Sequence, residues 1–112
     1  MHYRYEDAVK VTIPAVRIAV AIALSKEHGM SETVIANRLG VAQAAVSKYL
    51  SGRYSARIGR LVRLIIEKKM HVELVNAINL GQKRENIAIL TDKIASNRML
   101  MERAAGKVPG IK

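Results

Sequence analysis

The chain has 112 residues, the length of one domain, and 50% of them are apolar, enough for one packed core. The apolar residues are nearly all aliphatic, with no Phe and no Trp, which favours packed helices over nucleic-acid binding by base stacking on aromatic side chains. With 19 Lys and Arg against 9 Asp and Glu, the net charge of +10 favours a polyanionic partner, duplex DNA foremost. The lack of cysteine excludes disulfides and thiolate metal sites.

The first elements are an N-terminal arm and one helix. Residues 1–12 are polar with a short alternating patch, which predicts an arm or a short strand-like lead-in. A helix is expected from Pro14, a residue suited to a first turn, to Gly29. The apolar run 13–24 is too short to span a bilayer and contains Arg17, so we expect no membrane association and a cytoplasmic protein.

Turn and cap residues then divide the chain into further helices. Ser31 is a good N-cap for a helix that reaches Leu39, a second runs over 43–50, and a third opens at Ser55. Residues 70–81 have a helical pattern, and a long helix is expected over 83–104. The fold class is therefore all-α, with a helix-turn-helix core of four to five helices and a long C-terminal helix.

We expect one compact domain with two parts. Residues 1–69 form the DNA-binding core with its arm, and residues 70–112 form a helical extension. The positive charge is concentrated in the core, because residues 31–70 contain eight basic and two acidic residues. A basic segment next to a helical hairpin is typical of a DNA-binding surface.

Residues 31–52 have the spacing of two short helices that cross at a steep angle. The crossing needs a small residue, the turn needs one that tolerates positive φ, and an apolar residue must then enter the core. The second helix needs apolar residues four apart on its inner face, and a glycine after it. The residues that meet these needs are Ala36, Gly40, Val41, Val46, Leu50 and Gly52.

This segment resembles the helix-turn-helix of the lambda repressor and Cro superfamily, whose pattern is matched at Ala36, Gly40, Val41, Val46 and Gly52. The run 41–52 and the lead-in 13–17 are also similar to small archaeal predicted transcriptional regulators. The resemblance covers roughly residues 12–60. Members of the archaeal family often have cysteines in the C-terminal half, and since this chain has none, no metal or redox role is carried over.

The second helix of the motif, residues 43–50, is expected to enter the major groove of DNA. Gln43, Ala44 and Lys48 fall on its outer side and match the base-reading positions that the resemblance implies. Gln suits adenine, Ala a thymine methyl group, and Lys guanine or a phosphate. Contacts to phosphate are expected from Ser47, Arg38, Arg53 and Arg57.

The last helix has apolar residues at alternating spacings of three and four, as in a short coiled-coil seam. The seam residues are Ile87, Leu90, Ile94, Asn97 and Met101, with Asn97 as the polar position that fixes register. Such a helix either packs on its own domain or forms a homodimer that reads two half-sites. Both readings stay open from the sequence.

Nothing in the sequence predicts an enzyme. The three histidines lie far apart without metal-ligand spacing, no phosphate-binding glycine loop is present, and no cofactor or small-molecule effector is indicated. The sequence thus predicts a sequence-specific regulator that binds double-stranded DNA. Two alternatives are a nonspecific architectural protein, suggested by Ala44 and Ala45, and an antitoxin or adaptor that uses the last helix.

Overall fold

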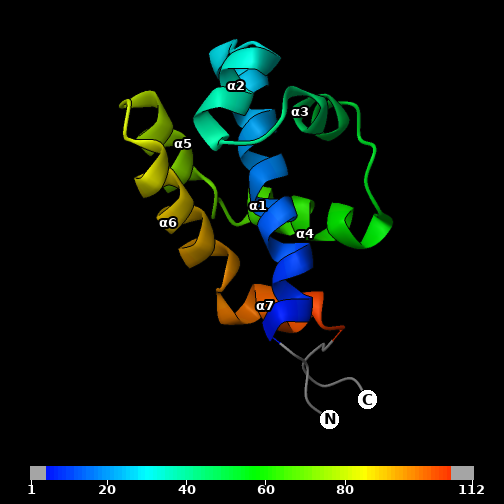
Figure 1. Ribbon diagram of the computed structural model, residues 1–112. Coiled ribbons are helices and arrows are strands. Elements are labelled where there is room, and N and C mark those ends of the chain that lie inside the picture. Colours follow the sequence, from blue (N-terminus) through cyan, green and yellow to red (C-terminus); the bar gives the residue numbers. More distant parts are fainter. Residues whose placement is uncertain (1–4, 107–112) are drawn as a thin grey trace.

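The computed structural model describes residues 5–106, with side chains from residue 8 onward, and in this part of the chain helices joined by turns and loops occur without strands, which confirms the all-α class (Figure 1). The helices in order are α1 Tyr5–His28, α2 Glu32–Leu39, α3 Gln43–Leu50, α4 Ala56–Glu67, α5 Val72–Asn79, α6 Arg84–Ala95 and α7 Arg98–Ala104.

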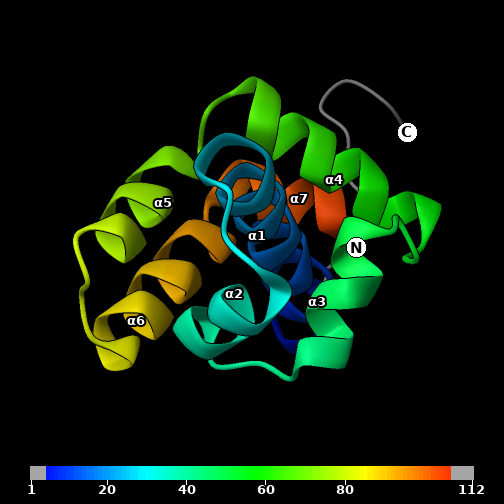
Figure 2. The same ribbon diagram turned by 90° about the horizontal axis from the view of Figure 1, so that it is seen from above.

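Helix α1 is the centre of the fold. It contacts every other helix of the described residues, and the view from above shows them arranged around it (Figure 2). Alanines and valines on several sides of α1, such as Ala15, Val16 and Ala19, are fully buried, and their small size lets the other helices approach closely. The stretch Ala8–His28 is long and apolar enough to cross a membrane, but it is packed as the central helix of a globular core.

The prediction of an arm over residues 1–12 is wrong for residues 5–12, which form the first turns of α1, while residues 1–4 lie outside the described residues. Pro14 therefore lies inside the helix, where it lacks the N–H that would bond to the carbonyl of Lys10. Burial compensates for this loss, because Ala8 and Thr12 pack into the core. The Thr12 hydroxyl also lies 3.9 Å from the sulfur of Met101.

The predicted long C-terminal helix is also wrong, because it is broken between α6 and α7. Asn97 is the N-cap of α7, and its Oδ1 accepts a hydrogen bond from the N–H of Leu100 over 3.2 Å. An Asn carboxamide offers the backbone this local bond in place of a continued helix. The role of Asn97 as a register-fixing seam residue is therefore wrong.

The other seam positions are used within the chain. Ile87, Ile94 and Met101 are buried, and Leu90 is half-buried. The helices that carry them, α6 and α7, both pack against α1. Ile87, Ile94 and Met101 thus belong to the core of one molecule, and Leu90 is the apolar seam residue that stays partly accessible.

His71, just before α5, is expected to make the stability of the fold depend on pH. Burial lowers its pKa below the usual 6.5, while the backbone of Ile65 and the charge of Glu27 act in the opposite direction. Its Nδ1 is buried without a hydrogen-bond partner among the described residues.

Just below pH 6.5, the unfolded chain binds a proton at this residue more readily than the folded chain does. The contribution of His71 to the free energy of unfolding should therefore level off above that pH and become unfavourable as the pH decreases below it. Urea unfolding across this range measures the effect. His71→Gln should flatten the slope and His28→Gln should retain it; an equal slope in both variants would assign it to other groups.

Candidate nucleic-acid interface

Helices α2 and α3 form the predicted helical hairpin, and the turn between them has the expected backbone. Ser31 caps α2, since its hydroxyl accepts from the N–H of Val34 over 3.2 Å. Gly40 ends α2 in the left-handed region, with φ of 70°. The N–H of Gly40 bonds to the carbonyl of Asn37, and that of Val41 to the carbonyl of Ala36. This pair of hydrogen bonds is a Schellman motif, which fixes the direction in which the chain leaves α2.

The inner faces of both helices are held by the core. Ile35 and Val46 are fully buried, and Ala36 is nearly so, which fits the need for a small residue where α2 and α3 pack together. Helix α3 also packs on α1, so the central helix supports the hairpin from behind. Leu50 and Val41 are half-buried against this core. Ala36 and Val46 thus lie inside the core, and Val41 and Leu50 lie at its edge.

The outer face of α3 is open to solvent. Gln43, Ala44 and Lys48 are exposed, and Ser47 is half-buried beside them. The first turn of α3 has no side-chain cap, because the N-cap residue is Ala42. Backbone N–H groups at such a helix start favour a negatively charged group. The sequence analysis did not predict this uncapped helix start. It could have been inferred from Ala42, because Ser, Thr, Asp or Asn is usual at an N-cap.

Arg53 is held against the end of α3 by a short chain of hydrogen bonds. The hydroxyl of Ser51 donates to the carbonyl of Ser47 over 2.8 Å, and Nε of Arg53 donates to that hydroxyl over 3.1 Å. The backbone N–H of Arg53 also donates to the carbonyl of Lys48. Gly52 permits this turn, with φ of 75°. The guanidinium is therefore positioned next to the exposed face of α3.

Arg38 has a structural bond that the sequence did not predict. Its Nη1 donates to the carbonyl of Ile78 over 2.8 Å, and the side chain is half-buried. The bond ties α2 to the end of α5. Since this geometry turns the guanidinium toward the body of the protein, we leave Arg38 out of the DNA-contacting set proposed below.

Arg57 lies in the first turn of α4, whose N-cap Ser55 accepts from the N–H of Ile58. Its side chain is exposed. Within residues 8–106 the single ion pair joins Arg98 to Glu102, so Lys48, Arg53 and Arg57 have no acidic partner in that range. In the same range no cluster of His, Asp and Glu is suited to hold a metal ion. This surface offers unpaired positive charge and hydrogen-bonding groups.

Comparison with known proteins supports this interpretation. Residues 22–66 match a protein-family model described as helix-turn-helix, which spans α2, α3 and most of α4. The match agrees with the resemblance to the lambda repressor and Cro type and indicates a DNA-binding domain. No curated protein and no solved structure matches the chain. The resemblance to small archaeal regulators stays an expectation.

Proposed function

We propose, on the premise that residues 22–66 form a DNA-binding helix-turn-helix, that this protein is a sequence-specific transcription regulator of the cytoplasm. Its α3 would lie in the major groove of double-stranded DNA. The observation that carries this proposal is the division of α3 into two faces. Val46 anchors one face in the core, and the opposite face presents Gln43, Ala44 and Lys48 to solvent.

The contacts follow from the side-chain chemistry. The Gln43 carboxamide suits paired hydrogen bonds to adenine, Ala44 is small enough to let α3 approach the bases, and Lys48 suits guanine. Ser47, Arg53 and Arg57 would contact the flanking phosphates, which fix position and supply affinity without reading sequence. The bond between Arg53 and Ser51 favours this role, because an ordered guanidinium loses less entropy on binding.

The replacement Gln43→Ala tests specificity. We expect the variant to lose about 1–3 kcal/mol of discrimination at one base pair and to keep its affinity for random DNA. Selection from a random pool gives the preferred site of the wild type, and titrations against single-base variants of that site give the energies. Asn86→Ala, which removes an exposed carboxamide from α6, is the matched control and should bind like the wild type.

Equal binding of Gln43→Ala and the wild type to every variant site would remove Gln43 from base reading. Failure of the wild type to enrich any sequence, together with a steep salt dependence, would instead favour the nonspecific architectural alternative.

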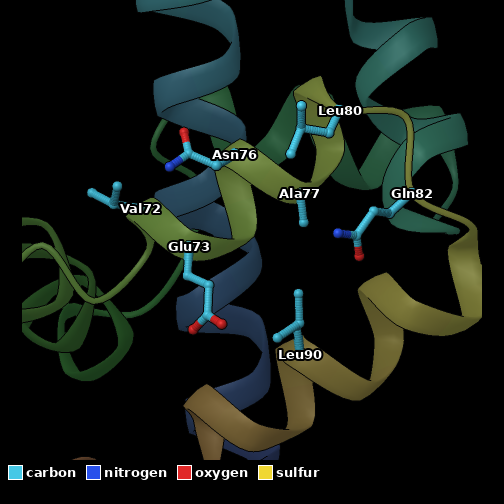
Figure 3. A pocket seen from close by; sticks show the side chains of 7 residues that line it. All are labelled: Val72, Glu73, Asn76, Ala77, Leu80, Gln82 and Leu90. Carbon is cyan, nitrogen blue, oxygen red and sulfur yellow. The ribbon is translucent and has the colours of Figure 1, made fainter.

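We also propose that the protein binds DNA as a homodimer through a groove between α5 and α6. The groove has a volume of about 440 Å³, and Leu90 of α6 points across it toward Ala77 of α5 (Figure 3). Leu80 and Val72, which line it, are 79% and 40% exposed, and the rest of the lining includes the polar residues Glu73, Asn76 and Gln82. Exposed apolar side chains in a groove with polar residues around them are typical of an interaction surface.

Charge and position favour a second copy as the occupant. Residues 72–95 contain three basic and three acidic residues, so this face is neutral in a chain of net charge +10. Two copies can meet here with less repulsion than at any basic face. Both views place α5 and α6 on the other side of α1 from α3, so the contact would leave both recognition helices uncovered (Figures 1 and 2). A protruding Leu80 beside a groove also suits a two-fold interface, in which each copy fills the groove of the other.

A further inference from the structure

A second concavity lies between α4 and α7. Its lining combines three arginines with an apolar floor, and its volume is about 270 Å³. Arg57, Arg60, Leu61 and Leu64 share one face of α4, because their spacings of three and four place them on neighbouring turns. Arg103 approaches from the last turn of α7. Residues far apart in the sequence are thus brought to one place.

The positive charge of this concavity is not balanced by the described part of the chain. Glu102, the acidic residue next to Arg103, pairs with Arg98 at 3.3 Å. Helix α4 has no acidic residue in its first turn, where the helix dipole is positive and Arg57 adds to it. Three guanidinium groups at such a place repel one another, and a bound anion would remove that repulsion.

The apolar floor distinguishes this place from an ordinary basic surface. Leu61 is buried and Leu64 is half-buried, so an occupant would contact aliphatic side chains as well as guanidinium groups. Arginine forks bind phosphate through paired hydrogen bonds, and three of them suit a doubly charged group. The volume is just below the usual range of ligand sites, which limits the occupant to a small molecule.

We propose that this concavity binds a phosphate monoester with a small apolar body, and that the bound ligand weakens DNA binding. The second part rests on the proposed function, because Arg57 is shared between this site and the DNA-contacting set. A ligand phosphate that engages Arg57 removes that guanidinium from the DNA backbone. Arg60 and Arg103 belong to the ligand site alone.

Phenyl phosphate is a suitable probe, with inorganic phosphate and phenol as references for its two halves. Calorimetric titration should show phenyl phosphate binding at least ten-fold more tightly than either reference. Arg103→Gln should weaken that binding ten-fold or more. Lys93→Gln, which removes one positive charge from an exposed position of α6 outside the concavity, should leave it unchanged. Phenyl phosphate should raise the Kd of the wild type for its selected DNA site and leave the Kd of Arg103→Gln unchanged.

Equal binding of phenyl phosphate and inorganic phosphate, or equal loss in both variants, would overturn the site in favour of general charge attraction. A loss of DNA affinity in Arg103→Gln without ligand would also overturn it, because the concavity would then belong to the DNA surface. If the wild type binds phenyl phosphate through Arg103 but binds no DNA, the site stands and the proposed function fails.

Discussion

Replacing Leu80 and Val72 together by Asp is expected to convert the protein from a dimer into a monomer and to weaken its binding to an inverted-repeat site by about 100-fold or more. Both side chains are exposed, so the double variant should fold like the wild type. In a dimer the binding of one half-site brings the second recognition helix to the other half-site, which raises its effective concentration. The variant loses this gain and keeps the contacts of a single α3.

The loss should therefore depend on the DNA. Affinity for an inverted repeat with half-sites about one helical turn apart should fall steeply, while affinity for a single half-site should stay the same. Sedimentation of the free protein and titration of both DNAs measure the two effects. A selected site without two-fold symmetry would also count against a dimer.

Ile66→Asp is the matched control, because Ile66 is an exposed apolar residue of α4 outside the groove. It should sediment and bind like the wild type. If the wild type sediments as a monomer both free and on DNA, or if the double variant binds the repeat as well as the wild type, the α5–α6 groove is not the dimer surface.

Local sequence rules located the helix-turn-helix well. Ser31 is predicted as an N-cap and Ser55 as the start of a helix, and both hydroxyls accept a hydrogen bond from a backbone N–H of the helix that follows. Gly40 was expected in the turn, where its φ is positive. These features depend on interactions within a few residues of the chain, so the residue types themselves carry the information.

The predictions that failed depended on tertiary contacts or on choosing between two local patterns. Pro14 is a common first-turn residue, but packing of Ala8 and Thr12 extended the helix before it. Asn97 suits both a seam position and an N-cap. The apolar residues keep their spacing of three and four across the break between α6 and α7, because both helices pack against α1. The bond from Arg38 to Ile78 joins positions 40 residues apart, which no local pattern reveals.

The candidate contact residues were found from the sequence because the helical period separates inner from outer faces. Val46 lies on the buried side of α3, and Gln43 and Lys48 lie on the exposed side, as that period requires. The two concavities were not predicted. One forms between α4 and α7, which are separated by two other helices in the sequence, and the groove of the consecutive helices α5 and α6 depends on how both pack on α1.

Leu100→Ala is expected to lower the free energy of unfolding by about 2–5 kcal/mol, the usual cost of a cavity in a packed core. Leu100 is fully buried in α7, which packs on both α1 and α4. Helix α1 also supports α3, so α7 and the recognition helix depend on the same central element. Met99→Ala, which truncates the half-buried neighbour, is the control and should cost about 1 kcal/mol.

Urea unfolding followed by circular dichroism measures both variants. If residues 70–112 were a separable extension, Leu100→Ala would produce two transitions and leave the later one at the midpoint of the wild type. A single transition at lower urea would show that the helices after the DNA-binding segment are part of its core. We expect the single transition, because α1 contacts every other described helix. Weaker packing of α7 on α1 should therefore also destabilise the packing of α3 on α1.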